Sequence, residues 1–182
     1  AVDARGWGGT VDERWQNDYL MLVDANLNAF KSDRLMDRSV NYSVDLSGET
    51  PQAVLEITYT HNGVSRDWKT TDYQSYLRIY TPQDSWLTQS AGLSHELQFG
   101  QAFGKKYFGT LIQVPLNSSK TFTFRYELGE GVDKQFYDLM IQKQAGLPNT
   151  PYAVRVTEAT GETSLYDFTL DQDIILSDVE EE

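Results

Sequence analysis

The sequence predicts an all-β protein, an antiparallel β-sandwich of roughly eight or nine strands with Greek-key connections and at most one short helix. Three observations predict this fold class. Apolar and polar residues alternate with a period of two over much of the chain, clusters of turn-forming residues separate these runs, and apolar residues at helical spacing are nearly absent. A closed β-barrel is the alternative arrangement of the same strands.

The strand candidates follow one another along the chain. The first clear run is 40–46, where Val40, Tyr42 and Val44 alternate with polar residues as in a strand with one buried face. A segment with turn chemistry, 48–52, separates it from the next run at 54–59. Further runs of the same character occupy 73–81, 107–116, 120–128, 135–142, 152–160, 163–170 and 174–176.

Two short segments have the composition of hairpin turns. They are Asn-Ser-Ser at 117–119 and Thr-Gly-Glu at 160–162. The one helix candidate lies near the N-terminus, where Leu27, Phe30 and Leu35 fall on one side of a helix that Asn26 would cap.

The length of 182 residues indicates a single domain with distinct ends. Residues 1–17 contain three glycines, Trp7 and Trp15 but no strand pattern, so we expect an N-terminal arm or linker whose tryptophans dock on the domain. The β-sandwich domain is expected over 18–176. The last segment, 177–182, is an acidic tail that we expect to be solvated.

Charge and composition exclude several classes of function. The chain has 15 Lys and Arg against 27 Asp and Glu, for a net charge of −12, and it has no cysteine. An acidic surface does not bind nucleic acid or anionic lipid, so we expect neither a nucleic-acid partner nor direct membrane contact from this segment. Without cysteine there is no disulfide, thiol nucleophile or Cys-ligated metal. Outward strand positions such as Asp45, Glu56 and Glu127 carry part of the charge, as expected of the solvated surface of a β-domain.

Several stretches resemble known proteins. The segments LEITYTHNG (55–63), YLRIYTPQDS (76–85) and VPLNSSKTFTFRY (114–126) are similar to strands and turns of bacterial extracellular immunoglobulin-like domains. A narrower set resembles the C-terminal region of a family of large membrane-anchored bacterial cell-envelope proteins of unknown function. This set consists of LVDANL (22–27), KSD (31–33), RSVNY (38–42), DW (67–68), 73–80 and IQKQAG (141–146).

The resemblance implies an extracytoplasmic immunoglobulin-like sandwich at the end of a longer protein, held at the cell surface by a membrane anchor outside this chain. It carries over no catalytic residue. We therefore expect a non-catalytic structural or interaction module whose partners are neighbouring domains of the same protein or components of the cell envelope.

Catalytic motifs do not appear in the sequence. The two histidines, His61 and His95, lie in no metal or nucleophile motif, and no G-x-S-x-G, H-E-x-x-H or P-loop occurs. A hydrolase on a sandwich scaffold is the third functional hypothesis, because a glycosidase needs only two carboxylates.

The candidate metal site is a calcium loop. Asp24, Asn26 and Asn28 place oxygen side chains at alternate positions, as at the start of a calcium-binding loop, and Asp33 is a candidate further ligand. Ala29 stands where such a loop has glycine, and Leu35 where it has a bidentate Glu. The alternative reading is that these side chains satisfy nearby backbone groups, in which case the chain has no cofactor.

The candidate ligand site is a carbohydrate-binding surface, which makes a glycan the alternative partner. Five aromatic residues fall within a short stretch: Trp68, Tyr73, Tyr76, Tyr80 and Trp86. Exposed aromatic faces stack on sugar rings. In a strand over 73–81, Tyr76, Arg78 and Tyr80 would share the outward face; packing between neighbouring strands is the competing explanation for these rings.

Overall fold

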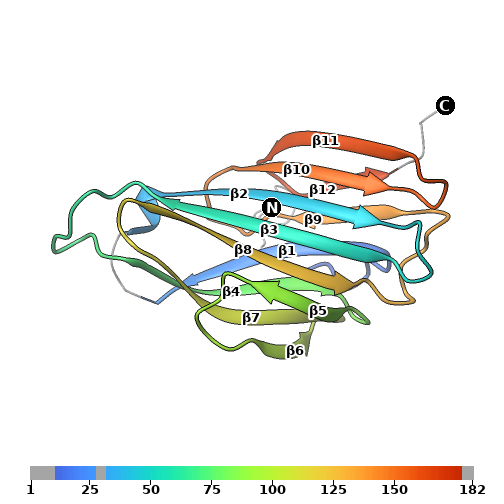
Figure 1. Cartoon of the computed structure of the whole chain (residues 1–182), viewed down its shortest axis with the longest axis horizontal. Helices are drawn as coiled ribbons and strands as arrows, with labels where there is room; N and C mark the ends of the chain where they lie inside the picture. The colour runs from blue at the N-terminus through green and yellow to red at the C-terminus, as the bar shows by residue number, and fades with distance from the viewer. Residues whose placement is uncertain (1–10, 28–31, 178–182) are drawn as a thin grey trace, which may run out of the picture.

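Two six-stranded sheets face each other in the computed structural model, which describes residues 11–27 and 32–177 (Figure 1). The first sheet has the order β12 (Ile174–Ser177), β9 (Asp138–Gln142), β1 (Asp18–Asn26), β4 (Tyr73–Pro82), β7 (Lys105–Val114), β6 (Gln98–Ala102). The second has the order β11 (Thr163–Leu170), β10 (Thr150–Thr157), β2 (Met36–Asp45), β3 (Gln52–His61), β8 (Ser118–Glu127), β5 (Trp86–Ala91). The predicted all-β sandwich is confirmed.

The sheets are mixed, which corrects the expectation of purely antiparallel strands. Two strands from the C-terminal third pair in parallel with the first two strands of the domain: β9 with β1, and β10 with β2. Every other pair is antiparallel. β9 and β10 follow connections that cross between the sheets, so they can run in the same direction as β1 and β2. A hairpin connection would make the paired strands antiparallel.

Most predicted strands are present, and three strands lacked a clear signal. The first five residues of β1 are all buried, so no alternation marks it. The other two, β5 and β6, are edge strands whose residues are mostly exposed, so neither has a buried face to mark it. Twelve strands therefore replace the expected eight or nine.

The turns and the helix were predicted with mixed success. The turn at 160–162 does join the β10–β11 hairpin, with Gly161 at a φ of 87°. The hairpin predicted at 117–119 is wrong, because β7 and β8 belong to different sheets and the segment between them crosses the sandwich. Asn26 is the last residue of β1, and the later, described part of the predicted helix is a 3₁₀ turn, η2 (Ser32–Leu35). Phe30 lies outside the described residues.

The core lies between the sheets and is built from the period-two positions. Inward side chains of β3 and β8, such as Leu55, Ile57, Phe122 and Phe124, are at most 1% exposed. Each large apolar side chain buried this way contributes roughly 1.5–3 kcal/mol.

A second, smaller apolar cluster covers the outer face of the first sheet. There the N-terminal arm packs Val11 and Trp15 against Tyr19, Met21 and Tyr80. The indole Nε1 of Trp15 donates to the carbonyl of Asp18 at 2.7 Å. The arm therefore docks from residue 11 onward, and β1 is buried on both faces; Trp7 and residues 178–182 of the tail lie outside the described residues. Within the described part of the chain, no helix is long and apolar enough to span a membrane.

The core contains one carboxyl group that has no cationic partner among the described residues. Asp18, fully buried at the start of β1, accepts hydrogen bonds on Oδ2 from the hydroxyls of Tyr42 (2.9 Å) and Tyr137 (2.5 Å). The backbone N–H of Tyr19 donates to its Oδ1 at 2.7 Å. Burial raises the pKa of Asp18 from 3.8 to about 6, although these hydrogen bonds lower it in part.

We expect Asp18 to make the protein less stable as the pH rises. The folded-state pKa lies above the unfolded value, so the folded protein binds an extra proton between them, and the contribution of Asp18 to the free energy of unfolding falls by about 3 kcal/mol between about pH 4 and pH 7. Urea denaturation of Asp18→Asn across this range should lack this decline. Asp45→Asn is the control, since bonds from Ser47 lower the pKa of Asp45, which gives the opposite dependence. Parallel curves for wild type and Asp18→Asn would contradict the prediction.

Candidate functional site

A cavity of about 680 Å³ opens at the end of the sandwich where β1 finishes and β2 begins. Its lining comes from both sheets and from the segment between β9 and β10. Asp24, Arg38, Tyr59, Tyr73, Pro148 and Thr150 are the residues that define its chemistry.

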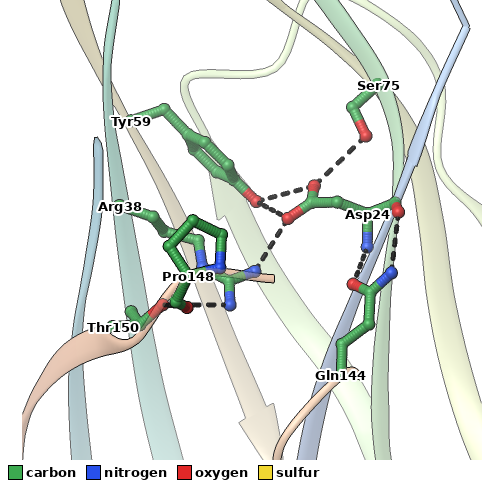
Figure 2. Close-up of polar contacts among 7 residues, drawn as sticks. All are labelled: Asp24, Arg38, Tyr59, Ser75, Gln144, Pro148 and Thr150. Carbon is green, nitrogen blue, oxygen red and sulfur yellow. Dashed lines mark hydrogen bonds and ion pairs between the residues drawn. The ribbon is translucent and has the colours of Figure 1, made fainter. Parts of the chain in front are cut away.

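Asp24 is the centre of the polar contacts at this end (Figure 2). The hydroxyl of Tyr59 donates to both of its carboxylate oxygens, at 2.9 and 3.0 Å. The hydroxyl of Ser75 donates to Oδ1 at 3.2 Å. Because Asp24 and Ser75 lie on the first sheet and Tyr59 on the second, this carboxylate joins the two sheets.

Arg38 supplies the charge that compensates Asp24. Its Nη1 lies 2.7 Å from Oδ2 of Asp24, and its Nη2 donates to the hydroxyl of Thr150 at 3.3 Å. The side chains of Arg38 and Asp24 are only 10% and 5% exposed. Burial by itself would lower the pKa of Arg38, but Tyr59 and Asp24 raise it above its ordinary value, so the guanidinium stays charged.

Gln144 fixes the backbone of Asp24. The side-chain amide accepts from the Asp24 N–H at 2.7 Å and donates to the Asp24 carbonyl at 3.0 Å. β9 has already ended at Gln142, so the Gln144 side chain takes the place of a peptide group beside β1. This contact holds the segment leading to β10 against the cavity.

The rim of the cavity is acidic. Asp33 accepts from the side-chain amide of Asn26 at 2.6 Å, and Asp37 accepts from that of Asn62 at 2.8 Å. Both aspartates are exposed, and neither forms an ion pair with another described residue. Arg34 also lines the cavity, so the rim presents two negative charges and one positive charge.

The proposed calcium ligands are divided between two roles. Asp24 is bound to the Arg38 guanidinium, a cation that already occupies the side of the carboxylate where a metal ion would sit. Asn26 and Asp33 do come together, but the Asn26 amide directs its donor nitrogen to Asp33. Asn28 lies outside the described residues. Among the described residues, no three His, Asp or Glu side chains group as metal ligands do.

The five aromatic residues of the predicted sugar surface are also separated. Tyr73 is buried against Tyr59, and Tyr80 is buried beneath the N-terminal arm. Tyr76 shares the outward face with Tyr80 as predicted, but it is half-buried and donates to Gln98. Trp68, 80% exposed in the β3–β4 connection, and Trp86, 67% exposed at the start of β5, leave their rings open to solvent.

The buried histidine, His61, contacts nearby backbone groups through both ring nitrogens. Nδ1 of His61 accepts from the N–H of Gly63, and Nε2 lies 3.0 Å from the carbonyl of Thr71. Both ring nitrogens therefore have structural partners. His95 is exposed in the connection before β6.

Sequence reasoning missed Arg38, Tyr59 and Gln144 as members of this site. A signal for Arg38 was present: it falls in phase with Val40, Tyr42 and Val44, so the period of two places a cation on the inward face. An inward charge needs a buried partner. That partner lies on the other sheet, and the sequence pattern does not name it.

Removing the cation should strongly destabilise the fold. Arg38→Met leaves the Asp24 carboxylate buried without its charge partner, at an expected loss of about 3–5 kcal/mol in the free energy of unfolding. Adding Asp24→Asn to this variant should recover most of the loss. Arg66→Met, which breaks the exposed ion pair with Asp72, is the control and should change stability by less than about 1 kcal/mol. Urea denaturation measures all three, and equal losses for Arg38→Met and Arg66→Met would contradict the expectation.

No family model and no curated protein sequence matches the chain. Among solved structures, it is similar to an M1 zinc metallopeptidase mutant from Deinococcus radiodurans, with 13% identity, a TM-score of 0.37, and coverage of 78% of this chain and 42% of that one. Legionella pneumophila aminopeptidase A is similar with 15% identity, a TM-score of 0.36, and coverage of 73% of this chain and 17% of that one. Leukotriene A4 hydrolase from Saccharomyces cerevisiae is similar with 10% identity, a TM-score of 0.32, and coverage of 84% of this chain and 31% of that one. The chain thus spans less than half the length of each of these proteins, and the likeness assigns it no activity.

Proposed function

We propose that this chain is a non-catalytic structural and interaction module of a bacterial cell-surface protein, placed outside the cytoplasm, and that it binds its partner at the cavity end of the sandwich. The observation that carries the proposal is the state of Asp24. Both carboxylate oxygens accept hydrogen bonds from protein donors, and one also bears the Arg38 guanidinium. A carboxylate held in this way positions other groups and is poorly suited to take a proton from a substrate.

The other buried polar groups support the same proposal. Asp18 is enclosed by tyrosine hydroxyls, and both ring nitrogens of His61 have structural partners. Neither residue lines the cavity. The cavity therefore offers fixed hydrogen-bonding groups on a rigid frame, which suits recognition.

The proposed partners are neighbouring domains of the parent protein or components of the envelope. The resemblance of several short segments between residues 22 and 146 to membrane-anchored envelope proteins supports the cell-surface placement, and the net charge of −12 suits a solvated exported domain. Glycan binding is the second candidate, supported by the exposed rings of Trp68 and Trp86. It has less support because two of the five aromatic rings proposed for stacking are buried.

We expect no turnover by the purified chain. Chromogenic glycosides, esters and peptide anilides should be hydrolysed no faster than by heat-unfolded protein, because the buried Asp24 carboxylate is already held by Tyr59, Ser75 and Arg38. Turnover by wild type that is lost in the Arg38→Met, Asp24→Asn double variant would contradict the proposal and assign catalysis to this site.

We also expect the cavity end to contact a partner in intact cells that carry the parent protein. A photo-crosslinking residue at Asn149, exposed on the cavity wall, should give a crosslinked product, whereas one at Asp171, exposed in the β11–β12 turn, should not. A membrane-impermeant amine reagent should label Lys69, which is exposed, before cell lysis. Crosslinks from Asp171 alone would place the interface elsewhere, and labelling only after lysis would place the chain inside the cell.

A further inference from the structure

The first half of β2 is an open sheet edge. β2 pairs with β3 over its whole length, from Met36 to Asp45, but with β10 only from Val40 onward. In Figure 1 the end of β2 nearest η2 extends past the start of β10. Within the described part of the chain, residues 36–39 therefore pair with a strand on one side only.

Two hydrogen bonds show which backbone groups face this open side. The N–H of Asn62 donates to the carbonyl of Leu35 at 2.8 Å, which continues the β2–β3 ladder by one opposed pair. Alternate residues of an antiparallel ladder bond to the same neighbour, so the odd-numbered residues of β2 face β3. At the other end, the N–H of Leu46 donates to the carbonyl of Thr157, the last residue of β10 that pairs with β2, so the even-numbered residues face β10. Met36 and Arg38 consequently direct their N–H and C=O groups to the open edge.

Pro151 explains why β10 does not cover them. In a parallel ladder a residue bonds to the two neighbours of the residue opposite. Continuing the β2–β10 register places Arg38 opposite Thr150, so the carbonyl of Arg38 would need the N–H of residue 151. Proline has no N–H, and the pairing stops there.

The open edge borders the cavity. Met36 and Arg38 line it from β2, and Leu147 and Pro148 line it from the segment before β10. The side chains of β2 alternate, with Arg38 in phase with the core and Asp37 exposed on the outer face. A strand laid along this edge would likewise direct alternate side chains into the cavity and toward Asp37.

The charges of the rim favour particular side chains on the outer face of an added strand. Asp33 and Asp37 accept amide hydrogen bonds but form no ion pair with another described residue, and with Arg34 on the same rim the negative charges remain in excess, as they do in the whole chain, which carries −12. A positively charged side chain on the outer face of an added strand would meet this potential.

We propose that the edge at Met36–Arg38 binds an extended peptide by strand addition, with apolar side chains entering the cavity and basic side chains beside Asp37. This inference rests on the proposed function and names the partner's chemistry: a strand-forming polypeptide segment with alternating basic and apolar residues. The four outward backbone groups of Met36 and Arg38 supply the hydrogen bonds, and the cavity and Asp37 supply selectivity.

The experiment uses the peptide acetyl-Lys-Val-Lys-Val-Lys-amide and the whole chain. In the free protein the amide protons of Met36 and Arg38 should exchange faster with solvent than those of Asp37 and Ser39, which bond to β3. Adding the peptide should slow exchange at Met36 and Arg38, as measured by NMR. The acidic counterpart, with Glu for Lys, should give no protection.

Matched variants on one strand test the charge. Asp37→Lys should weaken peptide binding by about tenfold or more, whereas Asp45→Lys, exposed on the same strand beyond the cavity, should leave it unchanged. Equal binding of the basic and acidic peptides, or binding that leaves the Met36 and Arg38 amides unprotected, would overturn strand addition. A cell-wall oligosaccharide that binds the cavity without protecting these amides would also overturn it while leaving the interaction module intact. The turnover assay and the crosslinks from Asn149 test the proposed interaction module independently of strand addition.

Discussion

The bond between Asp24 and Arg38 is the constraint around which this end of the molecule is organised. The two residues lie on facing sheets, and the apolar core gives way to polar side chains where they meet. Burying a carboxylate is costly, and at Asp24 the charge partner and the hydrogen-bond donors that offset this cost are Arg38, Tyr59 and Ser75. The requirement fixes the separation of the sheets here. It also positions Thr150, through Arg38, and the turn into β10.

The inward face of β1 carries a second buried carboxyl group, which has different partners. Asp18, Leu20, Leu22 and Asp24 follow one another at a spacing of two, so each end of the strand presents a carboxylate to the space between the sheets. Asp24 meets a guanidinium. Asp18 meets only hydroxyl and backbone donors, and its pKa rises to about 6. The same residue type, on one strand and one face, is thus paired with a guanidinium at one end and enclosed by uncharged donors at the other.

The sequence pattern predicted the sandwich because one-sided strands carry a period of two, and it failed where a strand is covered on both faces. β1 is such a strand, since the N-terminal arm packs on its outer side. The calcium hypothesis for Asp24 and Asn26 has a related origin. Ligands at alternate positions of a calcium loop have the same spacing as residues on one face of a strand, so local spacing does not separate the two. The inward phase of Arg38 indicates a buried cation, but it does not name Asp24 as the partner of that cation. Gln144 has no such periodicity, and only the folded chain shows its role.

The two parallel pairings have a consequence for folding during synthesis on the ribosome. Asp18 pairs with Leu139, and Val40 pairs with Tyr152. The N-terminal strands therefore emerge from the exit tunnel long before their partners are synthesised, and closing such long loops is slow. Until then, the apolar face of β1 and the edge of β2 remain uncovered. Chaperones that shield strand edges during synthesis would protect a nascent chain of this kind from aggregation.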